Sequence, residues 1–456
     1  MAYSSSVVIL CLLNLFLGVT DALSQDPEVF RVCIIGAGYS GLSAARHMKD
    51  NNLNFTVFEA ARGIGGTWRF DRNVGTDDNG LPLFTSQYTN LRTNTPRQTM
   101  EYFGYPFPES APSYPTGTCF YKYLQSFAKN FGLMEHIQLQ TLVTAVRHDD
   151  KEWQVSYMKA DTKENATETC SFIVVASGEY SSPFIPYIDG QQNYKGKIMH
   201  SHDYKDAGDF RDQRVLLVGA GASGLDLSIQ LMNVTSKLVH SHHLAYNQPD
   251  YPSNYIKKSD IQKFTPTGAV FTDDSTEDFD VVIFCTGYNY IHPFLELQSS
   301  GITATKKYVL PLYQHVVNIK YPTMAFVGIG KRVITKVMDA QAQYAAALAA
   351  GKFELPPQGE MLRHWLDHVQ RLRERDYKIT DVNVIGDDMA NYFNILHKEA
   401  GVTQVPEVLT IIRDFNAKNR LEDILNYRDY DYHIIDNEHF ERKYNPRIPV
   451  DCPIDE

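Results

Sequence analysis

A glycine cluster near the start of the chain is the first feature whose spacing suggests chemistry. Gly36, Gly38 and Gly41 follow the apolar run 30–35. A helical pattern then continues to Met48. A G-x-G-x-x-G turn between a strand and a helix is typical of dinucleotide-binding units. Its first glycine permits the tight turn, its second lets the backbone approach a pyrophosphate, and its third lets helix and strand pack closely.

An acidic residue stands where such a unit needs one. The next strand, predicted over 56–58, is followed by Glu59, roughly 20 residues after Gly38, where a carboxylate binds ribose hydroxyls. The alternative is a glycine-rich turn beside an ordinary surface glutamate. After Glu59 comes a loop containing Gly66, Thr67 and Trp68. We expect it to cover the pyrophosphate of a bound dinucleotide.

A second cluster repeats the first pattern further along the chain. Gly219, Gly221 and Gly224 follow the apolar run 214–218 and precede another helical pattern. The position that matches Glu59 is His242, so no acid stands there. A carboxylate would repel a 2′-phosphate, so its absence favours NADPH over NADH, with a histidine donating to the phosphate when protonated. The alternative is that His242 and the histidines beside it, at 240 and 243, are solvated and bind no ligand.

Two such turns predict an α/β fold with two Rossmann-like dinucleotide-binding domains. The pair that makes chemical sense is a tightly held FAD and an exchangeable NADPH, with Trp68 near the isoalloxazine. Strands predicted over 171–175 and 279–284 both end in small-small-Gly turns, where the chain is expected to cross between domains. The NADPH domain is therefore inserted in the FAD domain. The predicted division is a signal peptide (1–22), the first part of the FAD domain (23–181), the NADPH domain (182–295), and the second part of the FAD domain with a C-terminal tail (296–456).

Other patterns complete the expected architecture. Alternation over 145–157 predicts an antiparallel meander, and helices are predicted over 336–350 and 362–375. The segment 426–447 is rich in tyrosine and charge, and we interpret it as a surface segment without chemistry.

One segment carries a family signature. The chain resembles the flavin-containing monooxygenases, whose signature F-x-G-x-x-x-H-x-x-x-Y/F matches Gly196, His200 and Tyr204, with Tyr194 in place of Phe. Related Baeyer–Villiger enzymes carry Trp at the last aromatic position, which Tyr204 disfavours. We expect His200 and Tyr204 to shape the domain crossover rather than to perform acid–base chemistry.

The resemblance extends to the loops and implies an activity. The family's Gly-Gly-x-Trp loop matches 65–68, and its Thr-Asn pair matches Thr93 and Asn94. The resemblance implies that Asn94 is the catalytic side chain nearest the flavin, where it and bound NADP⁺ stabilise a C4a-hydroperoxide formed from reduced FAD and O₂. The chain is most similar to the insect branch, which implies conversion of tertiary amines, pyrrolizidine alkaloids in particular, to N-oxides.

Composition excludes several classes of function. The chain has 456 residues, 43% of them apolar and 21% charged, and a formal charge of −11. These values exclude a disordered chain and a multi-span membrane protein. The negative balance argues against binding nucleic acid or anionic lipid. No spacing typical of a metal site is present, and a homo-oligomer is left open.

The first residues predict export from the cell. Residues 7–19 are uncharged and apolar, and cleavage after Ala22 would secrete the protein without a membrane anchor. The alternative is an uncleaved anchor. Sequons at Asn54, Asn165 and Asn233 are consistent with a secreted glycoprotein. We do not expect a disulfide framework from the cysteines, and Cys33 and Cys285, which lie in apolar runs, are predicted to be buried thiols.

Three rivals to an alkaloid N-oxygenase remain at this point. One is a broader oxygenase that acts on both nitrogen and sulfur. Another is a secreted protein that keeps FAD as a structural group without turnover, a reading favoured by the scarcity of NADPH outside cells. The third is an uncoupled NADPH oxidase that releases hydrogen peroxide.

Overall fold

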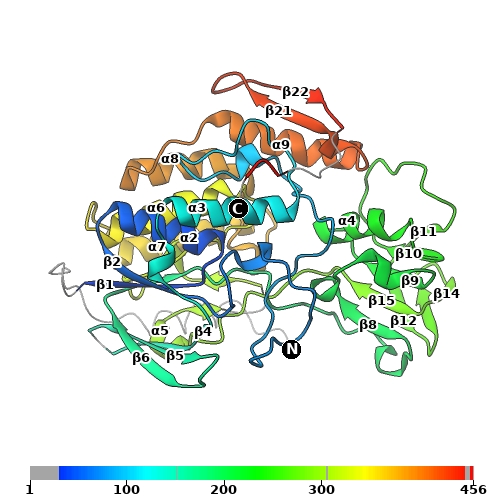
Figure 1. The fold of residues 1–456 in the computed structure, drawn as a ribbon, viewed down its shortest axis with the longest axis horizontal. Helices are drawn as coiled ribbons and strands as arrows, with labels where there is room; N and C mark the ends of the chain where they lie inside the picture. The colour runs from blue at the N-terminus through cyan, green and yellow to red at the C-terminus, as the bar shows by residue number, and fades with distance from the viewer. Residues whose placement is uncertain (1–29, 150, 305–306, 447–451, 455–456) are drawn as a thin grey trace.

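The structure is a computed structural model that describes residues 30–149, 151–304, 307–446 and 452–454. The expected signal peptide lies outside the described residues. Figure 1 shows two α/β units side by side, each built on its own sheet, with the second unit drawn in green at the right. The second sheet is parallel throughout, and the first is parallel except at β18 and β19. The predicted α/β class with two Rossmann-like units is confirmed.

The first sheet has seven strands, and its central strand β1 carries the first glycine turn at its end. β1 is buried and pairs in parallel with β2 on one side and β7 on the other. The sheet order is β18-β19-β20-β7-β1-β2-β3. In chain order the strands are β1 (Arg31–Ile35), β2 (Asn54–Phe58), β3 (Ile137–Gln138), β7 (Phe172–Val175), β18 (Leu312–Tyr313), β19 (Val317–Asn318) and β20 (Met324–Phe326).

The second sheet has five strands in the order β11-β10-β9-β15-β8. They are β8 (Lys197–His200), β9 (Arg214–Val218), β10 (Lys237–Ser241), β11 (Tyr255–Lys258) and β15 (Val281–Phe284), all paired in parallel. All of them lie in the sequence between β7 and β20, which are neighbours in the first sheet. The second unit is therefore inserted in the first.

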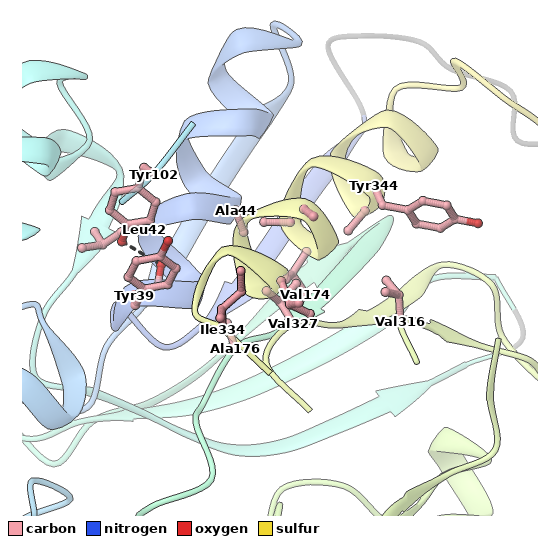
Figure 2. Close-up of a cluster of buried hydrophobic side chains, with 14 of the residues drawn as sticks. Tyr39, Leu42, Ala44, Tyr102, Val174, Ala176, Val316, Val327, Ile334 and Tyr344 are labelled. Carbon is pink, nitrogen blue, oxygen red and sulfur yellow. Dashed lines mark hydrogen bonds between the residues drawn. The ribbon is translucent and has the colours of Figure 1, made fainter. Parts of the chain in front are cut away.

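Two helices cover one face of the first sheet. α2 (Tyr39–Asp50) and α6 (Lys336–Ala349) pack against each other, and buried alanines on both let them approach closely. Figure 2 shows this cluster, with Tyr39 and Ala44 from α2, Tyr344 from α6, and Val174 and Val327 beneath them. Because the α2 end of the cluster is so well packed, the first glycine turn has a rigid support.

The remaining elements surround the two units. The predicted meander is present and is longer than expected. The smaller strands are β4 (Thr141–His148), β5 (Trp153–Lys159), β6 (Asn165–Cys170), β12 (Ile261–Phe264), β13 (Gly268–Phe271), β14 (Thr276–Asp278), β16 (Thr303–Ala304), β17 (Val309–Leu310), β21 (Tyr430–Ile434) and β22 (Phe440–Tyr444). The other helices are α3 (Gly117–Asn130), α4 (Ala222–Leu231), α5 (Leu297–Ser300), α7 (Gln358–Glu374), α8 (Met389–Ala400) and α9 (Glu407–Glu422). No helix among the residues described is long and apolar enough to cross a bilayer.

The C-terminal tail corrects one expectation. β21 and β22 form the exposed hairpin at the top of Figure 1, as a surface segment should. However, Tyr427 is buried, and the neighbouring Arg428 pairs with Asp226 of the second unit. The interpretation of the whole tail as a surface without chemistry is therefore wrong at its start. Local charge and tyrosine content gave no sign of this distant partner.

The cysteines correct a second expectation. Cys33 of β1 is bonded to Cys170 at the end of β6, so Cys33 is not a free thiol. Cys119 of α3 is bonded to Cys452 near the C-terminus. Cys285 is a buried free thiol, as predicted. The bridges span 137 and 333 residues of sequence, and only the folded chain brings such partners together.

Candidate active site

In the first glycine turn, close packing requires glycine at two of the three positions. Gly36 has φ +102°, and a Cβ there would lie 2.6 Å from the Ala176 carbonyl oxygen. A Cβ on Gly41 would lie 1.8 Å from the Gly36 oxygen. The residue after β7 therefore excludes a side chain at Gly36, and the turn itself excludes one at Gly41.

Gly38, in contrast, has room for a side chain at an ordinary contact distance at the start of α2. Within 4 Å, a Cβ on Gly38 would meet only Gly66, at 3.5 Å from its Cα. Gly66 lies in the loop that crosses this turn, and the Gly65 amide anchors that loop by donating to the Ala37 oxygen over 2.8 Å. Two facing glycines beside a helix N-terminus fit a pyrophosphate, because the backbone amides can approach the anion.

Glu59 directly follows β2, at the edge where the first turn lies. Its carboxylate accepts hydrogen bonds from the Ala37 amide (2.7 Å) and the Ala61 amide (2.8 Å) and is buried. Burial raises the pKa of Glu59, against the two amides, which lower it. The side chain is fixed where a dinucleotide ribose is expected, and its role as a ribose ligand stays a prediction.

In the second glycine turn, too, close packing requires glycine at two of the three positions. Gly219 has φ +97°, with the Cys285 oxygen 2.9 Å from a built Cβ, and a Cβ on Gly224 would lie 1.9 Å from the Gly219 oxygen. At Gly221 a Cβ would meet nothing within 4 Å. A residue that the sequence did not single out supports this turn: His240 Nε2 lies 2.9 Å from the Gly219 oxygen.

His242 follows β10 as Glu59 follows β2. The Gly219 amide donates to the Ser241 oxygen (2.9 Å) just as the Gly36 amide donates to the Phe58 oxygen (2.8 Å). Burial lowers the pKa of His242 to about 4, so the ring is neutral at physiological pH. Its Nδ1 accepts from the Leu244 amide, which leaves the buried Nε2 without a protein partner. His242 therefore offers one buried nitrogen without a protein partner, and its donation to a 2′-phosphate stays a prediction.

The loop of Gly66, Thr67 and Trp68, predicted to cover the pyrophosphate, is held by hydrogen bonds to residues 85 and 86 and by packing on α3. The Thr67 hydroxyl lies 2.9 Å from that of Ser86, and the Thr85 hydroxyl donates to the Thr67 oxygen. Trp68 packs on Phe120 of α3, with ring centroids 4.4 Å apart. The proximity of Trp68 to a flavin ring stays a prediction.

Thr93 and Asn94 lie where the two units meet. Asn94 lines a small cavity together with Ala222, Leu225 and Asp226 of α4 and with the start of the tail. One of the lining residues, Ala222, directly follows Gly221 in the sequence. Thr93 is buried, and its hydroxyl has no protein partner. The predicted catalytic residue thus lines a cavity together with Ala222, the residue that follows the second glycine turn, and its catalytic role stays a prediction.

The residues present fit two dinucleotides. Each turn has one glycine that close packing does not require, and a buried polar atom without a protein partner is present at His242 and at Thr93. Within the described ranges, no group of three or more His, Cys, Asp or Glu side chains is placed to hold a metal ion.

Comparison with known proteins agrees with this geometry. The family model "Flavin-binding monooxygenase-like" matches residues 29–245 and 253–417. The chain belongs to the flavin-binding monooxygenases. It is 56% identical to senecionine N-oxygenase of Tyria jacobaeae over 98% of this chain and 99% of that protein. It is 31% identical to trimethylamine monooxygenase of Roseovarius sp. strain 217 over 75% of this chain and 79% of that protein.

Solved structures give the same answer for this flavin monooxygenase. S-allyl-L-cysteine S-oxygenase from Allium sativum superposes with a TM-score of 0.81 at 28% identity, covering 88% of this chain and 94% of that one. Tmm from Pelagibacter sp. strain HTCC7211 superposes with a TM-score of 0.79 at 26% identity, covering 90% and 95%. The predictions of a monooxygenase and of FAD and NADPH as cofactors are confirmed.

The signature residues His200 and Tyr204 of this monooxygenase are buried within the second unit. Tyr204 is fully buried, and its hydroxyl donates to Gln230 of α4. Burial lowers the pKa of His200 to about 4, and its ring packs against Tyr288 beyond the end of β15. Neither residue lines the cavity beside Asn94. This placement agrees with the expectation that the two residues shape the crossover.

Several residues at the Asn94 junction escaped sequence reasoning. They are Tyr88, Lys205, Asp226, Asn416 and Arg428. No motif marks them, because each acts through a partner far away in sequence. The only local sign was the adjacency of Lys205 to the signature tyrosine.

Proposed function

We propose that this monooxygenase is an N-oxygenase of tertiary amines, with pyrrolizidine alkaloids such as senecionine as its substrates. The observation that supports this most is the 56% identity to senecionine N-oxygenase across nearly the full length of both chains. The proposed reaction takes one amine, one O₂, one NADPH and one proton to one N-oxide, one water and one NADP⁺. An N-oxide is charge-separated and crosses membranes poorly, which suits detoxification.

The residues of the site suit a reaction in which the protein orients and shields rather than transfers protons. Bound FAD supplies the redox chemistry between NADPH and O₂. The Asp226 carboxylate lines the cavity, but it is held by Arg428 at 2.5 Å and by the Tyr88 hydroxyl at 2.6 Å, so it is not a free base. We propose that the side chain of Asn94, which lines the same cavity, donates a hydrogen bond to reacting oxygen.

A substrate panel with product identification tests the proposal. Senecionine, simple tertiary amines and thioethers are each incubated with holoenzyme, and NADPH use, N-oxide, sulfoxide and hydrogen peroxide are measured. We expect NADPH use to rise with added alkaloid and N-oxide to match it. Peroxide without N-oxide would instead show an oxidase, and no NADPH use with any compound would show a binding protein.

A broader specificity is the second candidate. It is favoured by the likeness to the S-oxygenase from Allium sativum, at a TM-score of 0.81. Comparable turnover of thioethers and senecionine in the same panel would establish it and would remove the assignment to alkaloids alone.

We further propose that the protein is secreted and glycosylated. Support comes from the apolar run 7–19 and from the two disulfides, since such bonds persist in oxidising compartments. All three sequon asparagines, Asn54, Asn165 and Asn233, are exposed. Expression in insect cells should yield protein in the medium that begins at Leu23 and shrinks on glycosidase treatment. Retention in cell membranes with an intact N-terminus would refute secretion.

A further inference from the structure

A buried ion pair joins the C-terminal tail to the second unit. The Arg428 guanidinium donates through Nη1 to the Asp226 carboxylate at 2.5 Å, and Tyr88 donates to the other oxygen of that carboxylate. Burial opposes the charge, yet the Asp226 carboxylate raises the pKa of Arg428 above its ordinary value. Truncation of either partner would leave the other charge buried and unpaired, so the docked arrangement needs both members of the pair.

The same guanidinium holds the backbone beside Asn94. Nε of Arg428 donates to the Thr93 oxygen over 3.0 Å. Asn416 of α9 donates to the Asn94 oxygen, also over 3.0 Å. The C-terminal segment therefore holds two successive carbonyls of the segment that presents the Asn94 side chain.

The other end of that segment is held by the signature region. Lys205 is buried and donates to the Thr85 and Gln87 oxygens, and its own oxygen accepts from the Thr89 amide. Residues 85–94 thus run between two clamps, Lys205 from the second unit and Arg428 from the tail. Of the two, Arg428 is the one that also lines the Asn94 cavity.

The end of α9, just before the tail, also contacts the second unit. Asn247 donates from its backbone amide to the Leu421 oxygen and from its side chain to the Glu422 oxygen, at the end of α9. Figure 1 shows α9 ending close to α4. The second unit is therefore docked on the tail through α4 and on the end of α9 through the Asn247 loop.

We propose that Arg428 is a positioning residue that couples the docking of the NADPH-binding unit to the orientation of Asn94. A planar guanidinium with several donors in fixed directions can bind a carboxylate and a carbonyl at once, which a lysine ammonium does with less geometric control. When the second unit moves away and takes Asp226 from Arg428, the guanidinium that holds the Thr93 carbonyl loses its own anchor. Asn94 is then ordered chiefly when the unit that carries NADPH is docked. This inference rests on the proposed oxygenase function.

The test compares Arg428→Met and Arg428→Lys with Arg442→Met. Arg442 is a tail arginine on the exposed strand β22, bonded to Asn419 of α9 and absent from the cavity lining. Three quantities are measured on flavin-loaded protein: N-oxide and peroxide formed per NADPH, the dissociation constant of NADP⁺ by equilibrium dialysis, and amide hydrogen exchange over residues 89–100.

For Arg428→Met we expect N-oxide formation about tenfold to a hundredfold lower, as misplacement of a catalytic group produces. We also expect peroxide in place of N-oxide, NADP⁺ binding about fivefold or more weaker, and faster exchange over 89–100. Arg428→Lys should restore NADP⁺ binding more than it restores the yield of N-oxide per NADPH. Lysine keeps the positive charge beside Asp226 but lacks the fixed donor directions of the guanidinium. Arg442→Met should match the wild type.

Wild-type coupling and exchange in Arg428→Met would overturn the proposal, as would equal effects in Arg428→Met and Arg442→Met. If Arg428→Met does not hold flavin, Arg428→Lys and Asp226→Asn are measured instead. Peroxide release by these two variants no greater than by Arg442→Met would overturn the proposal. Failure of the wild type to oxygenate senecionine would instead count against the proposed function. The dissociation constant of NADP⁺ and the hydrogen exchange over 89–100 would then still test the positioning role of Arg428.

Discussion

Two alanine substitutions separate ligand binding from folding at the glycine turns. Gly38 and Gly221 begin their helices with φ −76° and −71°, which alanine adopts without strain. A Cβ at Gly38 meets only Gly66 at an ordinary contact distance, and at Gly221 it meets nothing within 4 Å. The protein alone should therefore accept alanine at both positions at a cost of about 1 kcal/mol or less.

The cost should appear when the dinucleotide binds. A methyl group in the path of a pyrophosphate forces ligand or loop to move, and overpacking of this kind costs ~1–3 kcal/mol. That corresponds to roughly a fivefold to 150-fold rise in the dissociation constant. Gly38→Ala should weaken FAD binding without affecting NADP⁺ at its own turn, and Gly221→Ala should do the reverse.

Gly41→Ala and Gly224→Ala are the matched controls. Their Cβ atoms would lie 1.8 and 1.9 Å from backbone oxygens, so these variants should lose folding rather than binding alone. FAD is measured by absorbance per protein and by reconstitution of stripped protein, NADP⁺ by equilibrium dialysis, and stability by thermal unfolding without ligand. Stoichiometric, tightly bound FAD in Gly38→Ala together with unchanged NADP⁺ binding in Gly221→Ala would refute the reasoning.

Four further predictions follow from individual side chains. Asn94→Ala should still be reduced by NADPH but form about 10²–10³-fold less N-oxide and release peroxide; normal N-oxide yield would remove Asn94 from the site. His242→Asp should raise the KM for NADPH about tenfold or more, because a carboxylate repels the 2′-phosphate, and a wild type that already prefers NADH would contradict this role. Replacing Cys119 and Cys452 by serine should lower the free energy of unfolding by about 2–5 kcal/mol, which urea denaturation measures against the wild type. Stability should fall as the pH drops below about 6.5, because the folded state holds His240 and His242 with pKa values of about 3 and 4, so the unfolded chain binds more protons there; equal urea midpoints at neutral and mildly acidic pH would contradict the burial of neutral imidazoles.

Local sequence was sufficient for the two dinucleotide turns. The runs before Gly36 and Gly219 form β1 and β9, and the helices after them begin at Tyr39 and Ala222. Such turns depend on a few adjacent residues, because the φ angle, the helix N-terminus and the close strand–helix contact are all set within one βα unit. Glu59 could be placed for the same reason, since a single βαβ unit fixes its distance from Gly38.

Charge states and long-range pairs depended on the folded chain. His242 was found by its offset, but its neutral ring follows from burial, which a run of histidines does not show. Cys33 lies in an apolar strand in either case, and only the approach of β6 to β1 made it a disulfide partner.

The sequence by itself determined which turns can hold FAD and NADPH and the order in which the chain builds the two units. The tertiary structure decided how those units meet. Arg428 reads as one more charge in a tyrosine-rich tail, yet folding places it against Asp226 and the Thr93 carbonyl. The physical reason is that a motif encodes contacts within a few turns of chain, whereas the junction at Asn94 is made by segments hundreds of residues apart, whose meeting depends on the packing of every element between them.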